Sequence, residues 1–379
     1  MKNQKINYPF LVLSALWLVV HIFLLFKNGI ITEGESPKYI EQAQLFLSTG
    51  HFSSGNFWLY AVQIFLLMVT IKLNLGYVFL VMVQLIFSLV ALWCFYRLAT
   101  TLFSGLTGLV CCALFLLNYP FHEFNTFLQT ESLFYSLTVI FSAYLLQTKT
   151  LTTRRGFIIF LWLVLICFTR PTGILFVPPA MLFLFFRFFR TISFSRKILI
   201  TTFVSVVFLF FLNTAIGSGG ELDFMLPFRD ERIICGVPTL PYFRDLKTTE
   251  NSNSLYGLMY YIYHNFGQFT RLAFLKSVAF WGLMRGYYST GHNIYLAVFF
   301  YPLFTAVVLG MRYWFTKASY ILTYCLFIIL LTWCTVILTC DDWHNRFFLT
   351  ISPYLIILAA PSINKLFSKF VSDGNERPA

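Results

Sequence analysis

The chain has 379 residues, of which 58% are hydrophobic, 20% are aromatic and only 11% are charged. Soluble domains carry about 25% charged residues, so this composition excludes an ordinary soluble enzyme and indicates a polytopic, all-α membrane protein. The net charge of +12 does not indicate nucleic-acid binding, because the basic residues are scattered as ones and twos between apolar runs, as in the loops of membrane proteins.

The first apolar run covers residues 9–26 and follows a basic start that contains Lys2 and Lys5. Such a start resembles that of a signal peptide, but no small-residue cleavage site follows Phe26. We therefore interpret this run as a retained first membrane span.

Residues 32–47, between the first apolar run and the next, are unusually acidic for this chain. Three carboxylates fall within nine residues, at Glu33, Glu35 and Glu41. Ser36 can cap a helix, and Pro37 is tolerated at the first helical position. The sequence therefore predicts that a helix begins at Ser36.

Tyr39, Ala43 and Phe46 fall on one stripe of this predicted helix, a spacing that suits a helix lying along a membrane surface. Glu35 precedes the helix, where the positive end of the helix dipole favours an ionised carboxylate. Two interpretations stay open for Glu35, namely a catalytic carboxylate and an ordinary acidic loop with a helix cap.

Residues 57–73 are apolar enough to form a second span, but the charge distribution argues against a crossing. If this segment lies at the interface or re-enters, ten spans remain and both termini are cytoplasmic. The inner loops then hold 15 of the 27 basic residues, as the positive-inside rule requires. The predicted spans are residues 9–26, 76–96, 103–117, 131–147, 156–169, 172–186, 198–215, 293–311, 318–338 and 347–364. The 15 basic residues are Lys2, Lys5, Arg97, Lys149, Arg154, Arg155, Arg187, Arg190, Arg196, Lys197, Arg312, Lys317, Lys365, Lys369 and Arg377.

This topology predicts one integral membrane domain over residues 1–379, with its polar groups gathered on the outer face. The outer segments are residues 27–75, 118–130, 217–292 and 339–346. Within the long third segment, residues 256–288 are amphipathic enough for another surface helix. Cys235 and Cys340 are the two cysteines in outer segments, and a disulfide between them is one possibility.

Arginines near the hydrocarbon need a physical reason, because a charge at the centre of a membrane helix costs about 2.5–3.5 kcal/mol. Arg170 lies at the outer tip of a tight hairpin. It either reaches out to the lipid headgroups or contacts a phosphate through its planar guanidinium. Arg346 opens the last span and either contacts a phosphate or pairs with Asp341 or Asp342.

Other polar residues of the outer segments are further site candidates. Glu131 follows Thr130 at the start of a span, which fits both a capped helix and a binding residue. Arg285 and His292 close the long outer segment and are candidates to contact a sugar or a phosphate. Glu123 and His344 are candidate ligands of an oxygen-and-imidazole metal site, although their spacing is not diagnostic.

The sequence contains no nucleotide-binding loop and no hydrolase or zinc-protease signature. Nucleotide-driven chemistry is therefore not expected. A site on the outer face has no access to nucleotide sugars, so any transferred group must arrive on another carrier.

Four motifs, in order along the chain, carry a family resemblance. They are Glu35-Ser36-Pro37-Lys38-Tyr39 continuing to Ala43, Phe57-Trp58-Leu59-Tyr60, Phe168-Thr169-Arg170-Pro171-Thr172-Gly173, and Asn345-Arg346-Phe347-Phe348 running to Pro353. With the helix start at Thr130-Glu131-Ser132, they resemble the polytopic glycosyltransferases of the GT-C fold, closest to family 39 and the lipid A aminoarabinose transferases. The resemblance covers roughly residues 10–365.

The resemblance implies an inverting enzyme of the bacterial inner (plasma) membrane that moves a sugar from a polyprenyl-phosphate carrier to a lipid, glycan or protein acceptor on the periplasmic face. It implies Glu35 as the catalytic base, Tyr39 beside it, and Arg170 and Arg346 as phosphate contacts. No cofactor is expected, since the polyprenyl-phosphate sugar is a donor substrate, and the sequence does not favour a divalent metal. The chain departs from the family in having Glu35 where Asp is usual, and Gly55-Asn56 where a basic residue and two prolines are common.

Three other classes of protein stay open, one of which is a non-catalytic membrane scaffold. A flippase or transporter of lipid-linked glycans would have polar residues in mid-span and paired broken helices, whereas here the polar groups gather at one face. A polysaccharide polymerase or ligase would use arginines in a large outer loop, and Arg229 and Arg232 are candidates for that role.

Overall fold

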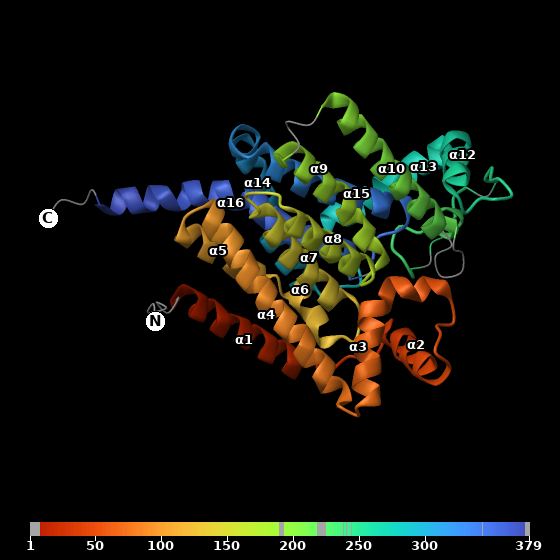
Figure 1. Cartoon of the computed structure of the whole chain (residues 1–379), viewed down its shortest axis with the longest axis horizontal. Coiled ribbons are helices and arrows are strands. Elements are labelled where there is room, and N and C mark those ends of the chain that lie inside the picture. Colours follow the sequence, from red (N-terminus) through yellow and green to blue (C-terminus); the bar gives the residue numbers. More distant parts are fainter. Residues whose placement is uncertain are drawn as a thin grey trace. The chain divides into compact units, whose positions relative to one another are not determined.

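The computed structural model describes residues 8–188, 193–217, 225–237, 239, 241–243, 245–342 and 344–375. Within these residues the regular structure is helical, with two isolated β-bridges, so the all-α prediction is confirmed (Figure 1). The predicted inner-face positions of Lys2, Lys5, Arg190 and Arg377 lie outside the described residues.

The chain divides into two compact units. Unit 1 comprises Met1–Ile174, Pro302–Leu322 and Pro353–Ala379, and unit 2 comprises Leu175–Tyr301 and Thr323–Ser352. The helices that begin in unit 1 are α1 (Tyr8–Asn28), α2 (Ser36–Thr49), η1 (Gly55–Tyr60), α3 (Ala61–Lys72), α4 (Gly76–Leu102), α5 (Gly105–Leu117), α6 (Tyr119–Glu123), η2 (Phe124–Thr126), α7 (Glu131–Leu146), α8 (Thr153–Cys167), η3 (Pro171–Phe176) and α15 (Ser319–Leu338). Those that begin in unit 2 are α9 (Val177–Phe188), α10 (Phe194–Gly217), α11 (Leu226–Arg229), α12 (Leu255–His264), α13 (Phe266–Gly282), α14 (Thr290–Lys317) and α16 (Arg346–Asn375).

Seven helices among the described residues are long and apolar enough to cross a membrane, and eight if the bent pair of α5 and the α6–η2 segment counts as one. The chain is therefore a multi-pass membrane protein. The predicted number of ten spans is not established, since α7 and α8 have only 16 and 15 residues, fewer than the roughly 20 that span a bilayer. The segment Gly55–Lys72 passes the same test of length and apolarity, so its predicted non-crossing placement stays a prediction.

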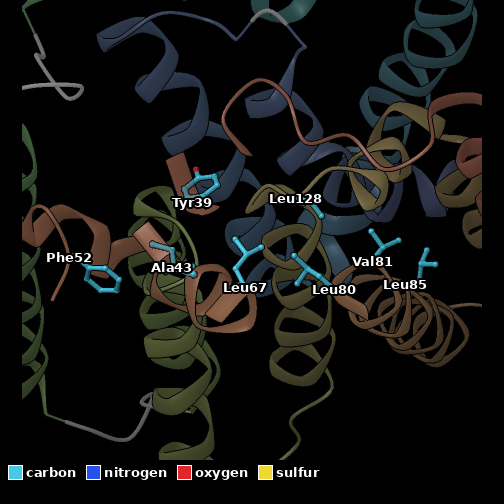
Figure 2. Close-up of a cluster of buried hydrophobic side chains, with 9 residues drawn as sticks. Tyr39, Ala43, Phe52, Leu67, Leu80, Val81, Leu85 and Leu128 are labelled. Atoms are coloured by element: carbon cyan, nitrogen blue, oxygen red, sulfur yellow. The ribbon is translucent and has the colours of Figure 1, made fainter. Parts of the chain in front are cut away.

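In unit 1, α4 packs against α5 and α7, and α1 lies along both α4 and α5 (Figure 1). The predicted stripe of α2 exists, but it faces protein. Figure 2 shows Tyr39 and Ala43 in one cluster with Leu67 of α3 and Leu80 of α4. The side chains of α3 and α4 therefore cover the apolar face that the sequence had suggested for a membrane surface.

The helix α2 begins at Ser36, as predicted, but Ser36 does not cap it. Glu35, not Ser36, occupies the N-cap position, and its side chain makes no capping hydrogen bond. Ser36 is buried, and its hydroxyl donates to the carbonyl of Ile31 at 3.5 Å. Because Ser36 already has a helical position, its hydroxyl turns back to the preceding loop instead of capping the helix.

In unit 2, the amphipathic helix predicted over residues 256–288 is two helices, α12 and α13. Asn265 lies between them with a non-helical backbone, φ −123° and ψ 39°. Leu258 and Tyr261 of α12 and Leu272 of α13 pack in one buried cluster with Phe228. The apolar faces of the two helices are thus buried partly within the protein.

Candidate functional site

Glu35 lies at the exposed start of α2, within one turn of two side chains that contact its carboxylate. Its Oε2 accepts a hydrogen bond from the Tyr39 hydroxyl at 3.0 Å and forms an ion pair with Lys38 Nζ at 3.0 Å. The side chain of Glu35 is 35% exposed. The carboxylate is thus oriented by two neighbours and still reaches solvent, as a catalytic base requires.

Tyr39 is fully buried beneath Glu35. Burial raises the pKa of its hydroxyl well above the usual value, and the negative charges of Glu35 and Glu131 raise it further, whereas Arg170 acts in the opposite direction. Tyr39 therefore stays protonated and continues to donate to Glu35 at ordinary pH. The same interactions place the charges of Glu131 and Arg170 close to this hydroxyl.

Arg170 and Glu131 form a buried ion pair, with Arg170 Nη1 2.8 Å from Glu131 Oε1. Glu131 begins α7 and is fully buried, and Arg170 follows α8 in the predicted hairpin. The hairpin is tight at Gly173, where an added Cβ would overlap the Ile166 carbonyl oxygen. Arg170 thus has Glu131 as a partner within the protein. This favours a contribution of Arg170 to the stability of the fold.

The segment 55–62 joins the same neighbourhood. The backbone N–H of Val62 donates to the carbonyl of Phe168 at 3.1 Å, which ties the start of α3 to the Arg170 hairpin. The Tyr60 ring lies 5.4 Å from the Tyr39 ring, and Lys38 Nζ lies 5.4 Å from the centre of the Tyr60 ring. Three of the four motifs are therefore neighbours in unit 1, although they are far apart in the sequence. Glu131 lies beside them.

The fourth motif lies in unit 2, where its arginine pairs with the protein's own carboxylate. Arg346 Nη2 is 2.6 Å from Asp342 Oδ2, and both side chains are nearly buried. Of the two interpretations for Arg346, pairing with Asp342 is the one that this geometry favours.

Arg285 is held in the same way in unit 2. It is buried, forms an ion pair with Asp341, and donates to Asn345 Oδ1 and to the Ala279 carbonyl at 2.7 Å each. Its Nη groups therefore already have protein partners, which favours a structural role over the predicted sugar or phosphate contact.

The backbone around Asp341 is fixed by a disulfide. Cys235 and Cys340 are bonded, with Cα atoms 5.3 Å apart, so the disulfide that the sequence left open is present. Beside it, Cys235 N–H donates to the Asp341 carbonyl at 2.7 Å and Asp341 N–H donates to the Ile233 carbonyl at 2.8 Å. These bonds hold the segment that carries Asp341 and Asp342.

The remaining candidates are dispersed. His292 lies in the first turn of α14, with its ring against Tyr288 at 4.5 Å. Glu123 accepts a hydrogen bond from Asn28 at 3.0 Å and lies 3.6 Å from Lys27, and the backbone N–H of His344 donates to Asp342. Within the described part of the chain, no three His, Cys, Asp or Glu side chains are grouped to hold a metal ion.

Of Arg229 and Arg232, the arginines that suggested a polymerase, Arg232 has a carboxylate partner in the protein. Arg232 is paired with Asp230, its Nη2 lying 2.6 Å from Asp230 Oδ2. A neighbouring carboxylate, Glu231, accepts hydrogen bonds from Phe243 N–H, Gln268 and Arg271. This part of the loop is organised by its own ion pairs.

Lys38 and Tyr60 belong to the sequence motifs, but they were not predicted as site residues. A signal for Lys38 was present, since Glu35 and Lys38 are three residues apart at a helix start, and such pairs face each other. Tyr60 comes from a separate segment, so only the packing of α2 against α3 brings it to the site.

The fold defines a multi-pass, all-helical membrane protein. Neither protein-family models nor curated proteins give a match to this sequence.

Proposed function

We propose that the protein is an inverting glycosyltransferase that moves a sugar from a polyprenyl-phosphate carrier to an acceptor on the outer, periplasmic face of the membrane. The observation that carries the proposal is the partly exposed carboxylate of Glu35, held by Lys38 and Tyr39 at the start of α2. The four ordered sequence motifs support the same class, because three of them are neighbours in unit 1.

In the proposed reaction, Glu35 takes the proton from the acceptor hydroxyl or amine. The acceptor atom attacks the anomeric carbon, and the bond between that carbon and the phosphate oxygen breaks. The bonding electrons leave with the polyprenyl phosphate. A single displacement of this kind inverts the configuration, as in inverting glycosidases.

The leaving phosphate requires a cation to stabilise its developing charge. Lys38 is the first candidate, because its ammonium lies at the Glu35 carboxylate and over the ring of Tyr39 at 5.1 Å. Arg170 is the second, because its positive charge acts on the Tyr39 hydroxyl that contacts Glu35. The Lys38 side chain is the more exposed of the two, whereas Arg170 is nearly buried in its ion pair with Glu131.

The decisive test is Glu35→Gln in purified protein reconstituted into liposomes with radiolabelled polyprenyl-phosphate sugars. We expect transfer to fall by about 10²–10⁴-fold, as on loss of a general base, while thermal stability stays near that of the wild type. Glu33→Gln is the matched control, because Glu33 is an exposed carboxylate two residues away, and it should retain activity.

Other outcomes redirect the assignment. Wild-type turnover in Glu35→Gln contradicts the role of Glu35, and loss of turnover in Glu33→Gln instead makes Glu33 the base. A wild-type protein that moves labelled lipid between leaflets without releasing polyprenyl phosphate is a transporter, not a transferase.

A further inference from the structure

We propose that unit 1 carries a second binding site, for the phosphate headgroup of an anionic phospholipid, in a pocket between α4, α7 and α8. The pocket has a volume of about 350 Å³. Its lining includes Trp93 and Arg97 of α4, Tyr144 of α7, Gln147 of the following turn, and Arg155 and Trp162 of α8. The proposal is independent of the transferase reaction, which none of these residues serves.

Two guanidinium groups supply the charge of this site. Arg97 lies in the penultimate turn of α4 with its guanidinium over the Trp93 ring at 5.1 Å, and Arg155 lies in the first turn of α8. No carboxylate of the described residues forms an ion pair with either. In this they differ from Arg170, Arg285 and Arg346, each of which pairs with a carboxylate of the chain.

Arg155 is also held in position for a ligand. Its Nη1 donates to the carbonyl of Thr150 at 2.8 Å and to the hydroxyl of the same residue at 2.6 Å. These bonds fix one side of the guanidinium. A planar guanidinium with fixed orientation matches the oxygens of a phosphate in two-point contacts.

The aromatic side chains of the pocket indicate that its ligand is a lipid. Trp93 precedes Arg97 by one helical turn in α4, and Trp162 follows Arg155 by two turns in α8. Because α4 ends and α8 begins at this end of the bundle, both tryptophans lie nearer the middle of their helices than the arginines do. An arginine at the boundary with an indole one or two turns deeper suits a headgroup with its acyl chain behind it.

The dimensions and the charge environment fit the same ligand. A volume of about 350 Å³ is at the lower end of small-molecule pockets, enough for a phosphate, a glycerol and the first part of a chain. Lys149, in the segment between α7 and α8, and Arg154, in the first turn of α8, are exposed and add positive charge outside the pocket. Basic pockets between membrane helices bind phospholipid headgroups of the negatively charged leaflet.

The test measures lipids that stay bound to the full-length protein by native mass spectrometry, after titration with phosphatidylglycerol or phosphatidylcholine in detergent. We expect the wild type to retain phosphatidylglycerol preferentially. Arg97→Gln/Arg155→Gln should weaken that binding by at least about tenfold, because the variant removes the guanidinium groups that donate charge-assisted hydrogen bonds to the phosphate inside the pocket. The matched control Lys149→Gln/Arg154→Gln removes the same charge outside the pocket, without removing a contact to the phosphate, and should change binding by less than about threefold.

Three results would overturn the proposal. Unchanged phosphatidylglycerol binding in the arginine double variant would show that the two arginines form no binding site. An equal loss of binding in the control variant would show that the effect comes from surface charge alone. Displacement of phosphatidylglycerol by millimolar inorganic phosphate would show that the site binds a free anion and not a lipid.

A second measurement keeps the proposal testable if the arginine variant does not fold. Brominated phosphatidylglycerol should quench the tryptophan fluorescence of the wild-type protein more than brominated phosphatidylcholine does. That excess should disappear in Trp93→Phe/Trp162→Phe, which leaves both arginines in place. Equal quenching by the two lipids in the wild type, or an excess that survives in this variant, would contradict the site.

Discussion

The charged cluster around Glu35 in unit 1 and the cluster around Asp341 and Asp342 in unit 2 use their side chains in different ways. In unit 1, Glu35 is partly exposed and takes its partners from the same helical turn, Lys38 and Tyr39. In unit 2, Arg285 and Arg346 are nearly buried and pair with consecutive carboxylates, Asp341 and Asp342. A disulfide from Cys235 fixes the adjacent Cys340.

This contrast separates a group available for chemistry from groups that hold the fold. A carboxylate that reaches solvent can exchange a proton with a substrate at little cost. If a buried arginine leaves its carboxylate partner, an unpaired charge stays buried in the protein. This costs about 3–5 kcal/mol. We therefore expect substitutions in the Asp341–Asp342 cluster to act on stability and those around Glu35 to act on turnover.

Arg285→Met should produce the largest loss of stability, about 3–5 kcal/mol, because Asp341 would be left buried without its cation. The measurement is denaturant unfolding of the detergent-purified protein. Arg285→Met/Asp341→Asn should recover part of the loss, since both charges are then removed. If Arg285→Met unfolds like the wild type but loses transfer, Arg285 is a substrate contact and the contrast between the units fails.

Cys235→Ser/Cys340→Ser should lower stability by about 2–4 kcal/mol, because a bond between residues 105 positions apart restricts the unfolded chain. Thermal unfolding with and without reductant measures the effect, and reductant should lower the wild type alone. The control Cys167→Ser/Cys334→Ser changes two free cysteines and should have a much smaller effect. Equal unfolding of the disulfide variant and the wild type would show that the hydrogen bonds of Asp341 suffice.

Tyr39→Phe should lower transfer about tenfold with little change in stability. The variant keeps the ring in the apolar cluster but removes the 3.0 Å hydrogen bond to Glu35. Stability should change little because Glu35 is partly exposed and water can replace the lost donor. Turnover and thermal unfolding should be measured on the same preparation. Tyr77→Phe, on a tyrosine that packs on the same cluster, should be neutral, and a purely structural Tyr39 would lose stability and turnover together.

The smallest expected effect is a pH dependence from Glu231 in unit 2. Burial alone would raise the pKa of this carboxyl, but hydrogen bonds from Phe243, Arg271 and Gln268 outweigh it and lower the pKa below the usual 4.5. The unfolded chain then binds the proton more tightly, so this stabilisation is complete above about pH 4.5 and is lost as the pH falls through the lower folded value.

Unfolding of the wild type between pH 3 and pH 7 should show this loss of stability at the acidic end of the range. Glu231→Gln should be flatter over the same range, because it has no carboxyl to titrate. An identical pH dependence in the two proteins would assign the acid sensitivity to other carboxylates.

Most of what the sequence predicted correctly concerns composition and order along the chain. Long apolar runs predicted the helices, and the start of α7 at Glu131 and of α16 at Arg346 agree with the predicted spans within a few residues. The partners of charged groups were harder to predict. Arg346 had two carboxylates four and five residues before it, and the sequence offered no means to choose between them and a phosphate.

The sequence by itself determined that this is a helical membrane protein, because apolar runs of helical length have few other stable conformations in a bilayer. It also marked Glu35, since a carboxylate at a helix start is recognisable from local spacing. Only the tertiary structure decided that Glu131 pairs with Arg170 and Arg285 with Asp341, and that Tyr60 lies beside Tyr39. Such contacts join residues tens of positions apart, and packing between helices, not local spacing, selects them.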